Sequence, residues 1–259
     1  MPKKATRASA VLLFLGALAY TAWVLEAVVR TGLDPVRAYV SELAAADQPL
    51  GGLFRATDLT AGLLVLAGAA LGLLATRAPA GPAPEPGAPR RARPGAGPAA
   101  RRPWLLAGWA ALALFGAATA LDSRLPLSCA PTADPECAAR ETAGLVPATH
   151  TAHAVSSSLA VTGALVAMAA LTLAARRYGL WRPLARTGPA LLALEAAATA
   201  WTLAAVAASE AGRGPWALGA GQRLQVLLVA VWTGVLAVSV ARERAGAGER
   251  TPRRERARG

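Results

Sequence analysis

The chain has 259 residues, of which 54% are hydrophobic and 16% are charged, and its formal net charge is +12. This composition is too apolar for a soluble domain of this length and indicates a membrane protein. A positive charge is also typical of nucleic-acid-binding proteins, but here most Lys and Arg residues flank apolar runs, as in membrane proteins. We therefore expect the lipid bilayer as a partner and no nucleic acid.

Six apolar runs are long enough to cross a bilayer as α-helices, which takes about 20 residues. The sequence predicts an all-α, polytopic membrane protein with a six-transmembrane-helix bundle over residues 9–241. The predicted spans are 9–29, 54–74, 104–121, 148–174, 189–209 and 224–241.

Two of these spans allow a choice between interpretations. The first follows a basic start and could be a cleaved signal peptide, but its length and the five later spans favour a retained helix. In the second, Gly68 and Gly72 form a small-xxx-small pair that permits close helix contact, unless they only reflect the abundance of glycine.

Three segments lie outside the predicted bundle. Residues 1–8 form a basic N-terminal segment, and residues 242–259 form a basic tail that we expect to be disordered. Residues 75–103 are rich in Pro, Gly, Ala and Arg and have no hydrophobic period. This composition predicts a disordered cytoplasmic linker.

The distribution of basic residues predicts the orientation of the spans. Of the 27 Lys and Arg residues, 20 lie in the N-terminal segment, the 75–103 linker, the 175–188 turn and the tail. If the chain crosses the membrane six times, all four of these segments lie on the same side of it. Loops rich in Lys and Arg face the cytoplasm. We therefore expect a multi-pass cell-membrane protein with both termini cytoplasmic.

Both cysteines, Cys129 and Cys137, lie in the loop between the third and fourth spans, on the expected outer side. That compartment is oxidising, so the two thiols are predicted to form a disulfide. Two unpaired thiols are the alternative.

Most ionisable residues of the spans lie near the expected outer face, and charged groups in a span are functional candidates. Local spacing offers simple partners, because Glu26 and Arg30 are four residues apart and Arg55 and Asp58 three. The residues that gather at this depth are Glu26, Arg55, Asp58, Asp122, His150 and His153.

His150, His153 and Ser157 share one face of the fourth span, since they are three and four residues apart. The two imidazoles could bind zinc with Asp122 or Asp58. A bound zinc would activate water for hydrolysis, with Asp58 or Glu26 as base and Ser157 as a further catalytic candidate. Structural polar packing of these side chains is the alternative.

Glu195 differs from this group because it lies in the fifth span, nearer the expected cytoplasmic side. A buried acid of this kind would suit a proton-coupled transporter.

Several short motifs resemble the bacterial and archaeal membrane family catalogued as domain of unknown function number 998. They are Asp34-Pro35 followed by the run Tyr39 to Leu43, then Leu121-Asp122 before a loop with proline and cysteine, and then His150 and His153. The resemblance implies a six-helix membrane protein and supplies no activity. A vaguer likeness is to membrane hydrolases of the alkaline ceramidase type, but these need three histidines and this chain has two.

Three functions remain open from the sequence. The first is binding or sensing of a lipid or small molecule in a polar pocket on the extracytoplasmic face, under a disulfide-braced loop. The second is metal-dependent hydrolysis of a lipid-like substrate at the outer leaflet, and the third is proton-coupled transport.

Overall fold

The computed structural model describes residues 3–77 and 102–248, and within these ranges all regular structure is helical. Seven α-helices and two 3-10 helices follow one another along the chain. They are α1 (Lys3–Tyr20), η1 (Ala22–Ala27), η2 (Val40–Ala44), α2 (Gly51–Arg77), α3 (Pro103–Asp122), α4 (Pro135–Thr142), α5 (Ala148–Arg177), α6 (Arg182–Glu210) and α7 (Leu218–Gly248).

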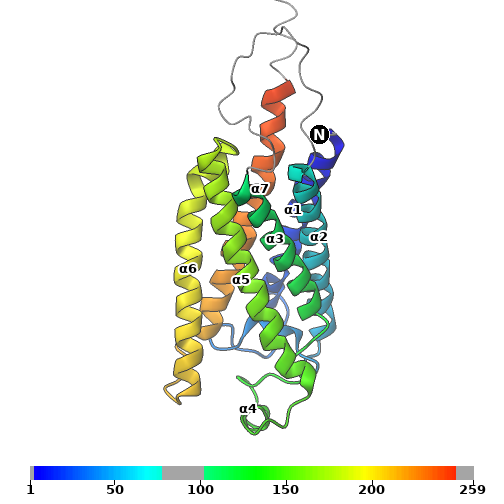
Figure 1. Ribbon diagram of the computed structural model, residues 1–259. Helices are drawn as coiled ribbons and strands as arrows, with labels where there is room; N and C mark the ends of the chain where they lie inside the picture. The colour runs from blue at the N-terminus through cyan, green and yellow to red at the C-terminus, as the bar shows by residue number, and fades with distance from the viewer. Residues whose placement is uncertain (1–2, 78–101, 249–259) are drawn as a thin grey trace, which may run out of the picture.

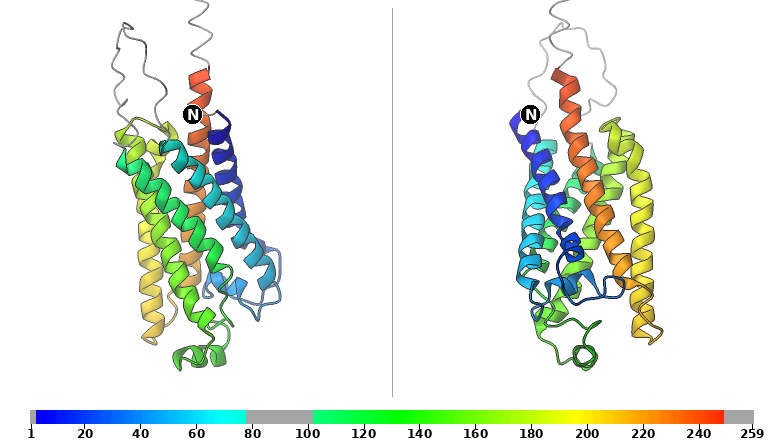
Figure 2. Two further views of the ribbon diagram at one scale, coloured as in Figure 1. Left: turned by 45° about the vertical axis from the view of Figure 1, so that its right-hand side comes forward. Right: turned by 180° about the vertical axis from the view of Figure 1, so that it is seen from behind.

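Six of the described helices are long and apolar enough to cross a membrane: α1 with η1, α2, α3, α5, α6 and α7. They lie side by side in one bundle, whereas the short helix α4 lies outside it (Figures 1 and 2). The predictions of an all-helical fold and of six spans are therefore confirmed.

The helices extend beyond several of the predicted span ends. A predicted span ends at the first charged residues, whereas a helix can continue through charged residues into water. Helix α2 continues to Arg77, and α7 continues to Gly248. Part of the predicted linker and part of the predicted tail are therefore helical. The remainder of both, residues 78–101 and 249–259, lies outside the described residues.

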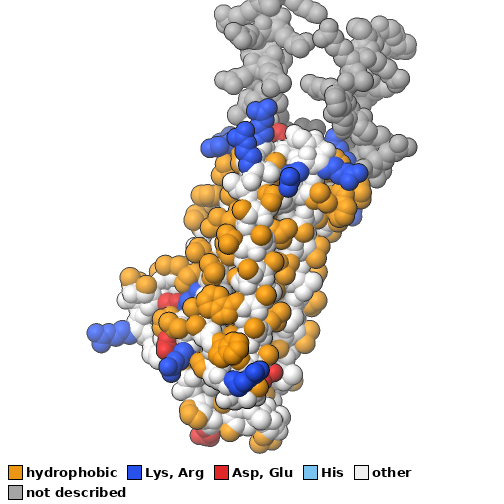
Figure 3. All heavy atoms as spheres, turned by 90° about the vertical axis from the view of Figure 1, so that its left-hand side faces the viewer, with side chains coloured by type: hydrophobic (Ala, Val, Ile, Leu, Met, Phe, Trp, Pro, Cys, Tyr) orange, Lys and Arg blue, Asp and Glu red, His pale blue; other side chains and the backbone are white. Residues whose placement is uncertain are grey.

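The two ends of the bundle differ in what they contain. The start of α1, the end of α7 and the α5–α6 turn lie together at one end, which we call the terminal end (Figures 1 and 2). Residues 21–50, 123–147 and 211–217 form the opposite, loop end. On the face in Figure 3, Lys and Arg lie at the terminal end and again around the loop end, and hydrophobic side chains are spread over the surface between the two ends.

Glycines allow the helices to approach closely. A Cβ atom on Gly62 of α2 would lie 2.5 Å from the backbone nitrogen of Ala120 in α3, and one on Gly116 would lie 2.5 Å from that of Leu66. Gly68 and Gly72 are packed in the same way against Leu13 and Trp109. The predicted close contact at the Gly68–Gly72 pair is therefore present.

Large side chains fill the centre of the bundle. Leu13, Leu171 and Trp232 are almost fully buried in one cluster with Trp109, whose ring makes an edge contact with Trp181 at 5.8 Å. Many Leu and Val side chains remain exposed on the outside of the helices, as expected for surfaces that face lipid.

Candidate functional site

A cavity of about 150 Å³ lies inside the bundle, toward the loop end. Residues of η1 and η2 and of helices α1, α2, α3, α5, α6 and α7 contribute to its walls. Its chemistry is mixed, with aromatic rings, small apolar groups, amides, hydroxyls and three carboxyl groups. The aromatic lining residues are Tyr20, Trp23, Phe54 and Phe115, and the acidic ones are Asp58, Asp122 and Glu195.

Asp122, at the end of α3, is the best-satisfied of the three acids. Its carboxyl group accepts a hydrogen bond from the Ser156 hydroxyl and lies 3.1 Å from the Ser157 hydroxyl at both oxygens. His153 Nδ1 lies 3.2 Å from Oδ1 of Asp122. One turn of α5 thus surrounds this carboxyl group with three polar side chains.

The neighbours of His153 define its role. Its Nδ1 lies 3.0 Å from the carbonyl oxygen of Leu125 as well as near Asp122, so this nitrogen faces two acceptors and must carry a proton. Its Nε2 lies 3.3 Å from Ser157 Oγ. Asp122, His153 and Ser157 therefore form a connected chain of polar groups, of which Asp122 and Ser157 line the cavity.

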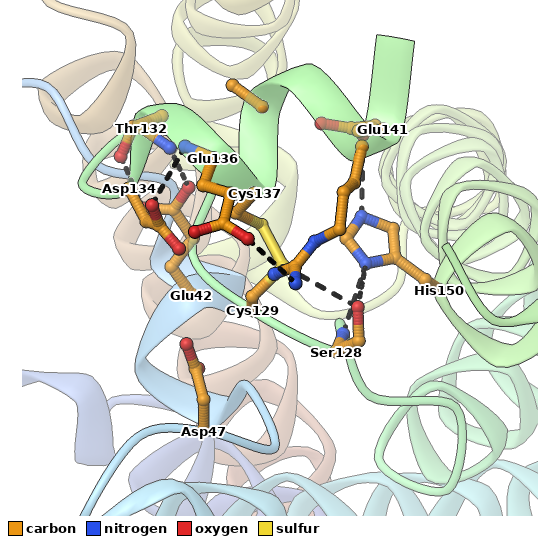
Figure 4. The surroundings of a disulfide bond; sticks show 12 residues. Glu42, Asp47, Ser128, Cys129, Thr132, Asp134, Glu136, Cys137, Glu141 and His150 are labelled. Atoms are coloured by element: carbon orange, nitrogen blue, oxygen red, sulfur yellow. Dashed lines mark hydrogen bonds and ion pairs between the residues drawn. A yellow bond between two sulfur atoms is a disulfide. The ribbon is translucent and has the colours of Figure 1, made fainter. Parts of the chain in front are cut away.

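His150 belongs to a different cluster, under the disulfide loop (Figure 4). Its Nδ1 accepts a hydrogen bond of 3.1 Å from the backbone N–H of Ser128, so the ring proton is on Nε2. That nitrogen lies 3.4 Å from Oε1 of Glu141. The imidazole is almost fully buried and is held by loop residues.

The predicted metal ligands are therefore divided between two clusters. His153 contacts Asp122, whereas His150 contacts Ser128 and Glu141. Within the described ranges, no three His, Cys, Asp or Glu side chains are grouped closely enough to bind a metal ion. Zinc binding by His150, His153 and Asp122 stays a prediction, and it would require one of the two histidines to leave its present partners.

Glu195 does not lie apart from the other acids of the spans, as the sequence suggested it would. It lines the same cavity as Asp58 and Asp122, and its side chain is 1% exposed. Its Oε1 lies 3.4 Å from the Thr199 hydroxyl, and its Oε2 is buried without a hydrogen-bond partner. The reason is the start of α6 at Arg182, well before the predicted Pro189, which places Glu195 in the middle of the helix.

The local ion pairs suggested by the sequence are replaced by other contacts. Arg55 donates hydrogen bonds to the carbonyl oxygens of Ala44 and Ala45, at 2.6 and 3.1 Å. Asp58 is left without a hydrogen bond or ion pair among the described residues. Glu26 pairs with Arg223 of α7, not with the exposed Arg30.

The loop end is braced by the predicted disulfide, which the structure contains between Cys129 and Cys137 (Figure 4). Asp134 caps α4 by accepting a hydrogen bond of 2.9 Å from the backbone N–H of Glu136. In the same loop, Thr132 donates to Glu42 of η2 through its backbone N–H at 2.8 Å and through its hydroxyl.

Burial changes the ionisation of two groups beside this contact. It raises the pKa of the Glu42 carboxyl group above its usual value, although the hydrogen bonds from Thr132 lower it in part. It also raises the pKa of the Tyr39 phenol to about 12, with the nearby Glu141 and Glu42 acting in the same direction. Tyr39 is thus neutral at physiological pH.

Sequence reasoning missed several polar residues of this region. Glu42 was quoted only as part of a motif, yet its side chain is fully buried. Trp23 and Gln225 fall within the predicted apolar spans 9–29 and 224–241, although both line the cavity. Arg223 lies directly before the last predicted span. An acid directly before the apolar run from Leu43 to Ala46 was the one signal in the sequence that could have revealed Glu42.

The fold and these motifs were compared with known proteins. A family model described as protein of unknown function (DUF998) matches residues 14–88 and 95–239. No curated protein and no solved structure matches the chain. Because the family model covers most of the chain, with at least part of each of the six spans, the protein belongs to the DUF998 family of proteins of unknown function.

Proposed function

We propose that this protein is a multi-pass cell-membrane protein that binds a lipid or small molecule in the cavity, from the extracytoplasmic side. The observation that supports this best is the cavity lining itself, in which aromatic rings and carboxyl groups meet inside an otherwise closely packed bundle. Ligand pockets of proteins typically combine apolar walls with a few polar groups that orient the ligand.

The orientation is part of this proposal. With 20 of the 27 Lys and Arg residues in segments of the terminal end, the positive-inside rule assigns that end to the cytoplasm and the loop end to the outside. The disulfide between Cys129 and Cys137 supports the same orientation, because disulfides persist in oxidising compartments.

Reporter fusions test the orientation. We expect alkaline phosphatase inserted after Gly144 to be active, since it folds only outside the cytoplasm, and a fluorescent protein fused after Gly259 to fluoresce. Activity of the phosphatase at the C-terminus, with none at Gly144, would reverse the topology and contradict this part of the proposal.

Ligand binding is tested by mass spectrometry of molecules that co-purify with the protein. Ala160 and Ala164 line the cavity from α5 and are buried, so Ala164→Leu or Ala160→Leu would fill it. We expect either change to remove a molecule that the wild type retains, whereas Ala154→Leu on the exposed side of the same helix retains it. An identical set of molecules in all variants would contradict binding in this cavity.

A second function, hydrolysis of a lipid-like ester, is favoured by the chain of contacts from Asp122 through His153 to Ser157. The carboxyl group lies at Nδ1 and the hydroxyl at Nε2 of one imidazole, at 3.2 and 3.3 Å. These two contacts are those of a nucleophilic serine with its base and the acid that orients it, although Ser157 here also donates directly to Asp122 and would have to turn its hydroxyl proton to His153. Ser157 Oγ would attack the ester carbonyl carbon, and His153 Nε2 would pass the hydroxyl proton to the departing alcohol before water releases the acyl group.

A fluorophosphonate probe, which reacts with activated serines, distinguishes this function from binding. We expect labelling of the wild type and of Ser158→Ala, because Ser158 is exposed and bonds only to its own helix. Ser157→Ala should remove the label. Absence of label on the folded wild type would leave ligand binding as the function and reject hydrolysis by Ser157.

A further inference from the structure

Among the described residues, no Lys or Arg pairs with two of the carboxyl groups in the cavity, and the Thr199 hydroxyl lies 3.4 Å from one oxygen of Glu195. Glu195 is 1% exposed, and its Oε2 has no hydrogen-bond partner. Asp58, on the facing helix α2, makes no hydrogen bond or ion pair with any described residue. Both line one cavity, so a ligand bound there is exposed to both carboxyl groups.

The other buried acids in the described part of the chain are compensated. Glu26 accepts hydrogen bonds from Nε and Nη2 of Arg223, Glu42 accepts two hydrogen bonds from Thr132, and Asp122 is surrounded by serine hydroxyls and His153. An unpaired acid inside a membrane bundle is costly, and such groups face a partner or a wet cavity. The unpaired acids are therefore concentrated at the cavity.

The remaining lining residues indicate that the missing partner of these two carboxyl groups is positively charged. Four aromatic rings line the cavity, and the faces of such rings attract cations. Among the described lining residues there is no Lys or Arg, which a phosphate or carboxylate ligand would require. The indole N–H of Trp23 is buried without an acceptor, so it can donate to an oxygen of the ligand.

We propose that the ligand of this cavity carries an organic ammonium group, which Asp58 and Glu195 pair with while the aromatic rings surround its alkyl substituents. A hydroxyl or ester oxygen near the ammonium accepts the hydrogen bond from Trp23. This inference rests on the proposed ligand-binding function and specifies its chemistry. A free amino alcohol and the headgroup of an aminolipid both meet the requirement, and the test separates them.

The full chain in nanodiscs of phosphatidylglycerol is titrated with choline and with its uncharged carbon analogue, in which C replaces N. We expect choline to bind and the analogue not to bind. Glu195→Gln and Asp58→Asn remove charge with little change in shape, and each should weaken choline binding roughly tenfold or more. Glu210→Gln, an exposed acid on the same helix α6 and outside the cavity lining, should bind choline like the wild type.

Nanodiscs of phosphatidylcholine identify the source of the ammonium group. If a lipid headgroup occupies the cavity, these nanodiscs raise the thermal stability of the wild type but not of Glu195→Gln, and free choline no longer binds measurably. If the ligand is a free amino alcohol, choline binds equally well in both kinds of nanodisc. Either result supports an ammonium ligand.

Four outcomes would overturn the inference. The first is equal binding of the uncharged analogue, and the second is choline binding that neither substitution weakens; in both cases ligand binding itself would stand. The third is no binding of choline and no stabilisation by phosphatidylcholine. A loss of thermal stability in both variants without any ligand would also overturn it, because unpaired acids contribute nothing to the fold when empty. The co-purification test reports separately on the proposed function.

Discussion

Arg223 of α7 holds Glu26, at the end of the first span, through two parallel hydrogen bonds of 2.5 and 2.6 Å. Its remaining nitrogen donates to the carbonyl oxygens of Ala38 and Gly219, at 2.8 and 3.1 Å. Both charged side chains are 9% exposed. The pair therefore joins the first and last spans of the bundle at the loop end.

Removing one member of this pair should leave a buried charge without a partner. We expect Arg223→Met to lower the free energy of unfolding by roughly 3 kcal/mol or more, measured by denaturant unfolding in detergent. Arg30→Met is the matched control, since Arg30 is exposed, and should change it by less than about 0.5 kcal/mol. Equal effects of the two changes would show that Glu26 does not depend on Arg223.

The α2–α3 contact should not accept a side chain at its closest point. In Gly62→Ala, the new Cβ atom would lie 2.5 Å from a backbone nitrogen and 2.7 Å from a carbonyl oxygen, neither of which can rotate away. We expect a loss of about 1–3 kcal/mol in thermal unfolding.

Gly234→Ala is the control for this change, because a Cβ atom at Gly234 in α7 would have no neighbour within 4 Å. It should leave the unfolding temperature unchanged or raise it slightly, because Ala favours a helix over Gly. A Gly62→Ala variant as stable as Gly234→Ala would mean that the two helices do not touch at this position.

The disulfide closes a short loop, with the two cysteines eight residues apart. By the chain-entropy model, we expect Cys129→Ser with Cys137→Ser to destabilise the protein by about 2–3 kcal/mol. The reductant dithiothreitol should lower the unfolding temperature of the wild type and leave that of the double variant unchanged. Sensitivity of the double variant to reductant would show that the effect does not come from this bond.

The raised pKa of Glu42 predicts a pH dependence of stability. A carboxyl group whose pKa is higher in the fold than in the unfolded chain stabilises the fold fully below its ordinary pKa. This stabilisation is lost as the pH rises through the raised value. We expect Glu42→Gln, which keeps an acceptor for the Thr132 N–H, to flatten the fall in unfolding temperature as the pH rises above the ordinary Glu pKa of about 4.3. An unchanged slope would assign that fall to other groups.

The six spans could be predicted because the thickness of a bilayer fixes the length of an apolar helix, and that length is visible in the sequence. The start of α6 could not be predicted, because the sequence favours Pro189 as its first residue. A helix tolerates proline in its first turn, and in a packed membrane bundle also in its interior. Here Pro183 lies in the first turn of α6 and Pro189 lies inside the helix.

The partners of the ionisable residues were the least predictable part of the site. For Glu26, the sequence offers Arg30 four residues away, while the true partner, Arg223, is 197 residues away. Which of several cations a buried acid meets depends on how the helices are arranged around one another, and no local spacing encodes that arrangement. The disulfide was predictable because only one pair of cysteines exists.

The change from α1 to the 3-10 helix η1 determines which residues of the first span point inward. A 3-10 helix has about three residues per turn, so side chains three positions apart are stacked directly above one another. Within η1, Trp23 and Glu26 follow this interval, so a cavity ring and the acid that pairs with Arg223 lie on the same side of the helix. In an α-helix a step of three residues would turn the side chain by about 60°. Continued α-helical winding would thus rotate Glu26 about 60° away from Trp23 and away from its present place beside Arg223.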